Sequence, residues 1–342
     1  MLSFLNYPNT MYLAVIEALK FNAFPNPKVG AVLVDKNNKI KSMGHHRGKG
    51  TNHAEIEIIQ NSLIDTDDTL FVTLEPCFHT DTSPSCADEL LKTNLKNIVV
   101  GDVDTDTRTN GKSIRKLKNA GLNVSIINNV NNFINPNYNN KNLHNGDITY
   151  IGKIAKSNNN KITNDDIGNE KYITNNSSLK LTHLLRATVD AILIGKNTLI
   201  NDNPLLNVRH ESLPNIEIEK YVLWGSDDRK IYDVIDKHFD KTFITTFDST
   251  KSNIMNINDL TFQNLEEFLI SQKISSLLVE GGNFVHKFFI DSSSYDYFYK
   301  FTSDYHIKNG LLLDPIINDY LTDKLSLNKE ISLKDNSLHI YN

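Results

Sequence analysis

Three short stretches decide the fold of the first half of the chain: His53-Ala54-Glu55, Leu74-Glu75-Pro76-Cys77 and, after eight intervening residues, Cys86. The first opens a predicted helix, the second ends a predicted strand, and the third begins another helix. One imidazole and two thiolates are the protein ligands of an open catalytic zinc site, whose fourth position holds water. The pattern therefore predicts a zinc site formed by His53, Cys77 and Cys86.

A carboxylate accompanies these ligands, because Glu55 follows His53 by two positions. Zinc lowers the pKa of a water towards about 7, and hydrolytic deamination needs a group that moves protons from this water to the ring and the departing ammonia. His-x-Glu followed by Pro-Cys and a second cysteine is the signature of zinc deaminases. We therefore predict a hydrolytic deaminase with Glu55 as its catalytic residue. In the alternative, a structural zinc site, His79 would be the fourth ligand.

Helices and strands alternate around these residues. Helices are predicted at 11–19, from His53, from Cys86 and at 112–120, and strands at 29–35, 39–43, 69–74, 97–101 and 122–127. This alternation predicts an α/β fold, a three-layer sandwich like that of the cytidine deaminases.

Size and composition indicate an ordinary globular protein of two domains. The chain has 342 residues, of which 39% are hydrophobic and 23% charged. Its net charge of -5 disfavours binding to nucleic acid. The two cysteines cannot form the disulfide framework of a secreted domain, and no apolar stretch is long enough to span a membrane. We therefore predict a cytoplasmic protein with no membrane partner.

Residues 128–146 are rich in asparagine, which is typical of a linker, although asparagine is frequent along the whole chain. A second α/β pattern begins at Thr149, with predicted strands at 149–155, 189–195, 220–224, 242–246 and 276–280. We predict two domains, 1–146 and 147–342.

The motifs of the first domain resemble those of the bifunctional riboflavin-biosynthesis deaminase-reductases. They include Pro25-Asn26-Pro27-Lys28-Val29-Gly30, the His53 motif and the stretch from Thr73 to Cys86, whose long gap between the cysteines is typical of this family. The resemblance implies that His53, Cys77 and Cys86 hold zinc, that Glu55 moves protons, and that Asn26 binds the heterocycle.

The second half is similar to the reductase of the same family. The similarity rests on Leu184-Leu185-Arg186-Ala187, on Asp190–Thr198, on Asn201–Arg209 and on Val279-Glu280-Gly281-Gly282. It implies a dihydrofolate-reductase-like fold that uses NADPH. It also implies that substrate is bound by Arg186, Leu206, Arg209 and Glu280, and cofactor by Lys156, Tyr172, Thr198, Asp202 and Gly282. A guanidinium is a planar, bidentate partner for phosphate, which suits Arg186 and Arg209 to the substrate phosphate.

The chain also departs from the family pattern. Thr80-Asp81-Thr82 replaces a Gly-Arg pair between the cysteines, and Asp104-Thr-Asp-Thr107 replaces an Asp-Pro-Asn-Pro turn. In the second half, Ser157-Asn158-Asn159-Asn160 replaces Ser-Leu-Asp-Gly, and Tyr172 replaces a tryptophan. The two departures in the first half affect how the substrate phosphate would be bound. The two in the second half affect whether the reductase would be active.

The sequence thus predicts a bifunctional enzyme with Zn2+ and NADPH as cofactors. It would deaminate a phosphorylated diaminopyrimidine and then reduce its ribosyl group to ribityl. Two alternatives remain: a deaminase with a degenerate reductase domain, and a deaminase acting on nucleic-acid bases. The family resemblance further implies a homo-oligomer.

Overall fold

The computed structural model describes residues 8–21, 23, 26–79, 84–138, 148–165, 172–226 and 230–342. The chain divides into two compact units, one of Met1–Asn139 with His210–Ile216 and one of Asn140–Arg209 with Glu217–Asn342. Residues 139–147 lie outside the described part, so the predicted boundary at residue 146 stays a prediction. No described helix is long and apolar enough to cross a bilayer.

The first unit is built on a five-stranded sheet with the order β2-β1-β3-β4-β5. Its strands are β1 (Gly30–Val34), β2 (Ile40–His45), β3 (Thr69–Val72), β4 (Asn97–Val100) and β5 (Asn123–Ile126). Strand β1 is antiparallel to β2 and β3, whereas β3, β4 and β5 run parallel. All five residues of β1 are buried, as expected of a strand covered on both faces.

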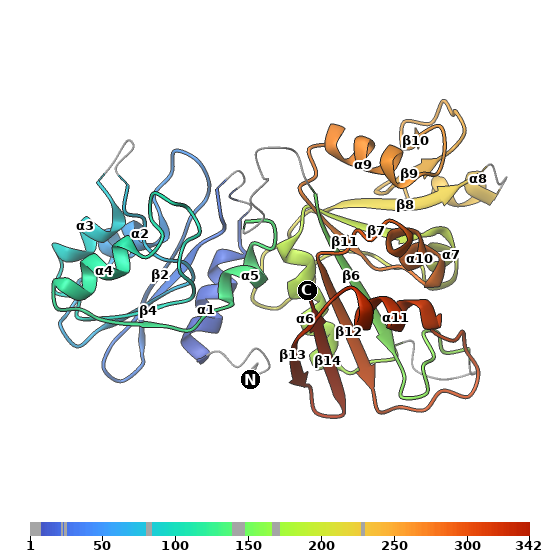
Figure 1. Cartoon of the computed structure of the whole chain (residues 1–342). Coiled ribbons are helices and arrows are strands. Elements are labelled where there is room, and N and C mark those ends of the chain that lie inside the picture. Colours follow the sequence, from blue (N-terminus) through green and yellow to red (C-terminus); the bar gives the residue numbers. More distant parts are fainter. Residues whose placement is uncertain are drawn as a thin grey trace. The chain divides into compact units, whose positions relative to one another are not determined.

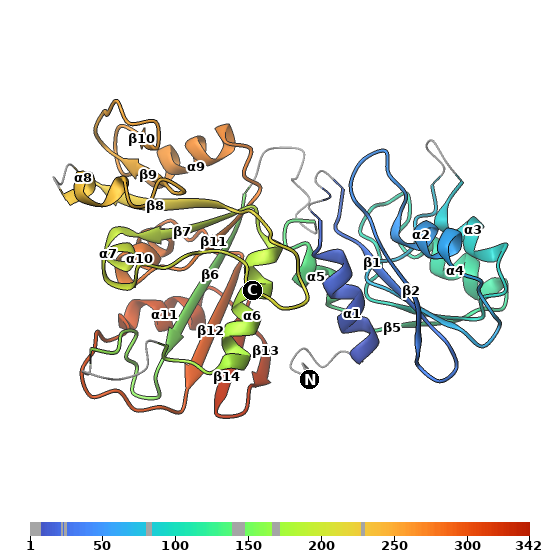
Figure 2. The ribbon, with the colours of Figure 1, turned by 180° about the vertical axis from the view of Figure 1, so that it is seen from behind.

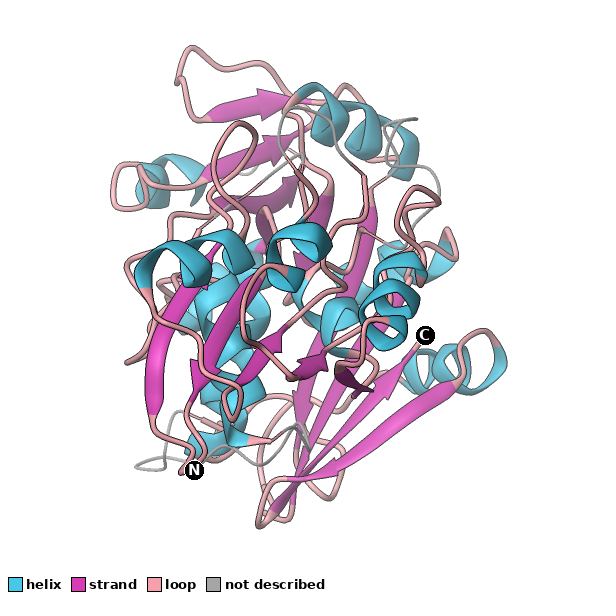
Figure 3. Cartoon of the chain, turned by 90° about the vertical axis from the view of Figure 1, so that its left-hand side faces the viewer, coloured by secondary structure: helices cyan, strands magenta, loops and turns pink. Residues whose placement is uncertain are grey.

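Helices flank this sheet (Figures 1 and 3). They are α1 (Asn9–Ala18), α2 (Ala54–Asn61), α3 (Cys86–Leu91), α4 (Lys112–Asn119) and α5 (Val130–Ile134). The predicted helices from His53 and Cys86 are confirmed, and the three-layer α/β fold with them. One prediction needs correction: α5 lies inside the stretch predicted as a linker. The reason is that Val130, Phe133 and Ile134 give this short segment a buried apolar side.

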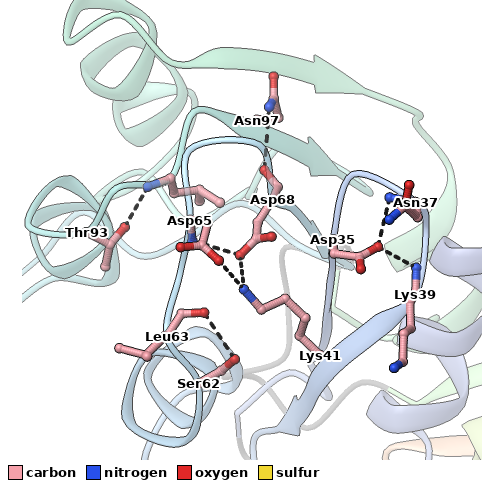
Figure 4. Close-up of polar contacts among 11 residues, drawn as sticks. Asp35, Asn37, Lys39, Lys41, Ser62, Leu63, Asp65, Asp68, Thr93 and Asn97 are labelled. Atoms are coloured by element: carbon pink, nitrogen blue, oxygen red, sulfur yellow. Dashed lines mark hydrogen bonds and ion pairs between the residues drawn. The ribbon is translucent and has the colours of Figure 1, made fainter.

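An ion-pair cluster joins β2 to the segment before β3 (Figure 4). The Lys41 Nζ lies 2.8 Å from an Asp65 oxygen and 2.6 Å from an Asp68 oxygen. Asp68 is only 2% exposed, and its carboxylate also accepts a hydrogen bond from the Asp65 backbone N–H at 2.8 Å. These contacts fix the connection between α2, which begins directly after His53, and β3, which leads to Cys77.

The second unit contains a nine-stranded sheet with the order β10-β9-β8-β7-β11-β6-β12-β14-β13. The strands are β6 (Thr149–Lys156), β7 (Ala191–Gly195), β8 (Glu219–Gly225), β9 (Thr242–Thr245), β10 (Ile254–Asn256), β11 (Ser276–Val279), β12 (Tyr297–Ser303), β13 (Leu327–Ser332) and β14 (Asn336–Tyr341). Strands β6 to β12 pair in parallel, and β13 and β14 form an antiparallel end. The predicted second α/β region is thereby confirmed.

Helices cover both faces of this sheet (Figures 1 and 2). They are α6 (Asn176–Thr188), α7 (Lys196–Asp202), α8 (Lys230–Ile235), α9 (Phe262–Ser271), α10 (Asn283–Asp291) and α11 (Pro315–Asp323). One apolar core joins α9, α10 and α11 to the strands through residues such as Leu269, Phe289, Phe298 and Tyr320. The carboxyl ends of β6, β7 and β11 meet at one edge of the sheet, where open α/β folds bind ligands.

Candidate functional site

Two helix starts and one loop bring the predicted metal ligands together. His53 is the N-cap residue of α2, Cys86 is the first residue of α3, and Cys77 follows β3. The Nδ1 of His53 lies 3.2 Å from the Cys86 Sγ, and the Cys86 backbone N–H donates to the Cys77 Sγ at 3.2 Å. The ligand atoms of these three residues lie within 4.8 Å of one another. A single ion can therefore reach all three.

The donor set fits a catalytic zinc site. Among the described residues, the group of possible ligands around this point consists of His53, Cys77 and Cys86. His79, the candidate fourth ligand, instead has its Nδ1 3.4 Å from the Thr109 hydroxyl. Three protein ligands leave a fourth position for water, which is the arrangement of a catalytic rather than a structural site.

The electrostatics of the ligands also suit a cation. The pKa of Cys77 is lowered to about 4, chiefly by its hydrogen bond with the Cys86 thiol. The pKa of His53 is raised to about 9, chiefly by its hydrogen bond with Cys77. The hydrogen bonds among the ligands thus favour a thiolate at Cys77, and a divalent cation would replace the protons that the ligands hold.

Glu55 lies beside the ligands in the first turn of α2. It is 3% exposed, and burial raises the pKa of its carboxyl group to about 7. Its position depends on Gly44 of β2, because a Cβ there would lie 2.5 Å from the Ala54 carbonyl oxygen. The missing side chain at residue 44 lets α2 pack directly on β2, which carries Glu55 to the ligands.

Asn26 belongs to a chain of hydrogen bonds through His46, and the sequence assigns no role to His46. Its Nδ2 lies 2.9 Å from the His46 Nε2, and the His46 Nδ1 lies 3.0 Å from the Asn52 carbonyl oxygen. The His46 and His53 rings meet edge to face, with centroids 4.9 Å apart. Because a carbonyl oxygen can only accept, His46 donates through Nδ1 and accepts from the Asn26 amide. His46 therefore orients Asn26 beside the metal ligands.

Glu75, two residues before Cys77, has a positioning role. Its carboxylate accepts hydrogen bonds from the backbone N–H groups of Asp104, Gly111 and Ile114 at 3.1, 2.7 and 3.2 Å. It therefore occupies the N-terminus of α4 and fixes the loop of residues 104–111, hereafter the 104–111 loop. Glu75 belongs to the Leu74–Cys77 motif, but the local sequence does not predict this role.

In the second unit, a buried ion-pair triad lies where β6, β11 and α6 meet. The Nε of Arg186 is 2.6 Å from Glu280 Oε1 and its Nη2 is 3.1 Å from Oε2, while the Nζ of Lys153 is 3.6 Å from Oε2. Burial raises the pKa of Glu280, but the charges of Arg186 and Lys153 outweigh this and lower it to about 2. Lys153 was missed by sequence analysis, because a single lysine in a strand carries no distinguishing local signal.

The other two predicted substrate residues lie on the segment after α7. The Arg186 Nη1 donates to the Asn207 carbonyl oxygen at 3.1 Å, so this segment is held beside the triad. Arg209 is exposed, and its backbone N–H donates to the His183 Nδ1 at 3.1 Å. Leu206 is buried with a φ of 51°, a left-handed conformation that a leucine adopts only under tertiary constraint. The packing around the triad therefore fixes the backbone conformation of the segment after α7.

Glycines leave space at the predicted cofactor edge. A Cβ at Gly281 would lie 2.5 Å from the Val285 Cβ, so α10 packs closely on the end of β11. A Cβ at Gly282, the N-cap of α10, would meet nothing within 4 Å. No side chain covers the backbone at Gly282, so a phosphate could approach the start of α10, as at other helix N-termini. Thr198 and Asp202 lie on α7, which follows the end of β7.

The other two predicted cofactor residues are Lys156, the last residue of β6, and Tyr172, which precedes α6. Lys156 is three positions after Lys153 in a regular strand, so the two side chains lie on opposite faces of β6. The Lys156 Nζ donates to the Asn160 Oδ1 at 2.8 Å. Tyr172 is 52% exposed. Their contacts with a cofactor stay predictions.

Residues 157–160, whose sequence departs from the family pattern, form a tight turn. Asn160 has a φ of 62°, the left-handed conformation for which glycine is favoured and asparagine tolerated. The Ser157 backbone N–H donates to the Lys161 carbonyl oxygen at 2.9 Å. The Asn159 side chain donates to the Ile307 carbonyl oxygen at 2.8 Å and accepts from the Ile307 N–H at 3.2 Å. Asparagines therefore hold this turn at the positions where the family pattern has Asp-Gly.

Comparison with known proteins agrees with both units. Residues 6–102 match the cytidine and deoxycytidylate deaminase zinc-binding region, and residues 160–300 match the RibD C-terminal domain. The riboflavin biosynthesis protein RibD of Chlamydia pneumoniae is 31% identical over 291 residues, 78% of this chain and 76% of that protein. The RibD of Aquifex aeolicus is 35% identical over 214 residues, 59% of this chain and 57% of that protein.

Solved structures share the fold along the chain. RibD of Acinetobacter baumannii is 24% identical with a TM-score of 0.61, and a deaminase/reductase of Thermotoga maritima is 24% identical with a TM-score of 0.63. Each alignment covers 97% of both chains. Fold and site thus define a zinc-dependent deaminase joined to a reductase of the dihydrofolate-reductase type. The chain belongs to the riboflavin biosynthesis protein RibD family, with deaminase and reductase activities and with zinc and NADPH as cofactors.

Proposed function

We propose that the chain acts on 2,5-diamino-6-(ribosylamino)pyrimidinone 5'-phosphate in two steps. In the first, water replaces an amino group of the pyrimidine, so that a ring carbonyl forms and ammonia leaves. In the second, a hydride and a proton convert the ribosyl group to ribityl. The observation that carries the proposal is the convergence of one imidazole, two cysteine sulfurs and a buried carboxylate at one point of the first unit.

In the deaminase site His53, Cys77 and Cys86 would hold the metal, which would supply a water-derived nucleophile at neutral pH. Glu55 accepts a proton from the water and gives it to the ring nitrogen; it then takes the second proton, from the hydroxyl added to the ring carbon, and gives it to the departing amine, so that a carbonyl remains. Asn26, oriented by His46, hydrogen-bonds the heterocycle. The burial of Glu55 keeps its carboxyl group away from bulk water, so that protons pass to substrate rather than to solvent.

In the reductase site the buried triad positions the substrate. Glu280 is held by Arg186 and Lys153, and we assign the substrate phosphate to the exposed Arg209 and a further substrate contact to Leu206 of the same segment. NADPH supplies the hydride, and orientation is the main task of the protein in such a step. Cofactor contacts come from Thr198, Asp202 and the open backbone at Gly282, with Lys156 and Tyr172 at the margin of the site.

We further propose the substrate class, cellular location and oligomeric state of the enzyme. A negative net charge of -5 favours a small phosphorylated pyrimidine over nucleic acid as the substrate. We also propose a cytoplasmic homo-oligomer with domains 1–146 and 147–342, as the family resemblance implies.

One assay tests the proposal. Purified protein with its zinc content measured is given the diaminopyrimidine substrate, and ammonia release and NADPH oxidation are followed together. We expect about one zinc per chain, ammonia release first and NADPH oxidation after it. Ammonia release without any NADPH oxidation would favour a deaminase with a degenerate reductase domain. Absence of ammonia release in zinc-loaded protein would overturn the proposed first step.

A further inference from the structure

The segment after α7 carries two residues assigned to the reductase substrate, Leu206 and Arg209, but it has no regular structure of its own. Residues 204–209 belong to no helix or strand, and they form no backbone–backbone hydrogen bond with the described residues. Leu206 and Val208 are buried, so apolar packing restrains the segment. The direction of the backbone at Arg209 therefore depends on polar side chains from other elements.

Two side chains of α6 supply these polar contacts. The Arg186 Nη1 donates to the Asn207 carbonyl oxygen at 3.1 Å, and the Arg209 backbone N–H donates to the His183 Nδ1 at 3.1 Å. His183 precedes Arg186 by three positions, so the two side chains lie on the same side of the helix. Helix α6 thereby holds the segment at one carbonyl oxygen and at one N–H group two residues further on.

The protonation of the His183 ring follows from these contacts. Its Nδ1 also lies 3.1 Å from the Asn207 carbonyl oxygen, but one nitrogen of a neutral imidazole cannot both accept and donate a hydrogen bond. The Arg209 N–H can only donate, and the Asn207 oxygen already receives the Arg186 guanidinium. The Nδ1 of His183 is therefore the acceptor, and the ring proton lies on Nε2.

The surroundings of His183 keep the ring neutral. Burial, together with the positive charges of Arg186 and Arg209, lowers the pKa of His183 to about 4. The Glu280 carboxylate acts in the opposite direction and is outweighed. A doubly protonated ring would carry a proton on Nδ1 and could not accept from the Arg209 N–H. The acceptor is thus present at neutral pH.

We propose that His183 is a positioning residue of the reductase, whose Nδ1 holds the Arg209 backbone so that the guanidinium can meet the substrate phosphate. The role of Arg209 rests on the proposed function, whereas its contact with His183 does not. The Arg209 guanidinium is exposed and donates through Nη1 to the Asn207 side-chain oxygen, within the same segment. Its place is therefore set by the backbone that His183 and Arg186 hold.

The first test compares variants that keep or remove the acceptor in the full-length protein. Asparagine places an oxygen near the position of Nδ1, glutamine places one near Nε2, and phenylalanine keeps a ring without an acceptor. KM and kcat for NADPH oxidation are measured on the deaminated intermediate. We expect H183F to raise KM by about 3- to 10-fold, the scale of one neutral hydrogen bond, with kcat little changed. H183N should recover most of this loss and H183Q little of it.

A double-mutant cycle with R209A separates positioning from a general loss of stability. If His183 acts through Arg209, H183F should change KM by less than about twofold in the R209A background. N176A, at the exposed first residue of α6, is the control and should leave KM as in wild type. An unchanged KM in H183F, no recovery in H183N, or an equal effect of H183F with and without Arg209 would each overturn the proposal.

Hydrogen exchange at the Arg209 amide provides a readout that needs no activity. The amide should exchange faster in H183F than in wild type, and in H183N it should exchange as in wild type. Unchanged exchange in H183F would overturn the hydrogen bond with His183. If wild type oxidises no NADPH with the deaminated intermediate, the second step of the proposed function fails, and the exchange measurement still decides this contact.

Discussion

The Arg186 guanidinium and the Glu280 carboxylate form a two-point ion pair, with distances of 2.6 and 3.1 Å, inside the second unit. Lys153 adds a third charge at 3.6 Å. Desolvating such charges is costly, and the arrangement is stable only while each has its partner. This cost agrees with the proposed role of Glu280 and Arg186 at the reductase site.

Glu280→Gln should unfold the second unit more easily and abolish NADPH oxidation. The substitution leaves Arg186 and Lys153 buried without a carboxylate, which costs about 3 kcal/mol or more. Thermal unfolding and NADPH oxidation on the deaminated intermediate measure the two effects. Glu330→Gln, at an exposed position of β13, is the control and should change neither. A Glu280→Gln protein with full reductase activity would contradict the assigned role.

Glu55→Gln should abolish ammonia release while zinc remains bound. General acid–base groups contribute about 100- to 10,000-fold to rate, so we expect a loss of at least about 100-fold. NADPH oxidation on the supplied deaminated intermediate should be unaffected, because Glu55 belongs to the other unit. Glu89→Gln on α3 is the control. Full activity in Glu55→Gln would remove Glu55 from the mechanism, and loss of zinc would reveal a metal ligand instead.

Gly44→Ala should lower zinc content and ammonia release together. The new Cβ would lie 2.5 Å from the Ala54 carbonyl oxygen, so α2 must move away from β2. Overpacking of this kind costs about 1–3 kcal/mol, and it displaces His53 and Glu55 with the helix. Zinc analysis and ammonia release measure the effect, with Ser42→Ala on the same strand as control. Unchanged zinc and activity would show that α2 does not depend on this close contact.

The second unit should lose stability between pH 6.5 and 4. Burial lowers the pKa of His286 to about 4, from 6.5 in the unfolded chain, and its Nδ1 and Nε2 contact the Tyr295 hydroxyl and the Lys153 carbonyl oxygen. The unfolded state therefore takes up a proton first as pH falls, and on the order of 3 kcal/mol is lost across this window. Thermal unfolding at several pH values measures it.

His286→Asn keeps polar atoms at this position and should flatten the pH dependence, although it lowers stability at pH 7. His306→Asn, at an exposed position, is the control and should leave the pH dependence as in wild type. An unaltered slope in His286→Asn would assign the pH dependence to other groups.

The turn at residues 157–160 should tolerate a return to the family pattern. Asn160→Gly keeps the left-handed φ of 62°, so NADPH oxidation should be unchanged. Asn160→Val should cost about 1–2 kcal/mol, because a β-branched side chain clashes in this conformation. Unfolding and NADPH oxidation of both variants provide the measurements. Equal stability of the two variants would contradict the conformation of Asn160.

Local sequence signals were enough for the metal site. His53, Cys77 and Cys86 stand at helix starts and after a strand, and such positions are encoded by neighbouring residues along the chain. The same holds for the alternation of strands and helices that defines both folds. The short helix α5 escaped this reasoning, because its asparagine-rich composition hides the few apolar residues that bury it.

Only the tertiary structure decided which partners those residues meet. His46 beside Asn26, Lys153 beside Glu280 and Thr109 beside Phe78 are each contributed by chain segments separated in sequence. No local pattern encodes such pairs, because pairing depends on strand order and on close packing at glycines such as Gly44 and Gly281. The sequence determined the chemistry available at each site, and the packing of sheet and helices determined how that chemistry is arranged.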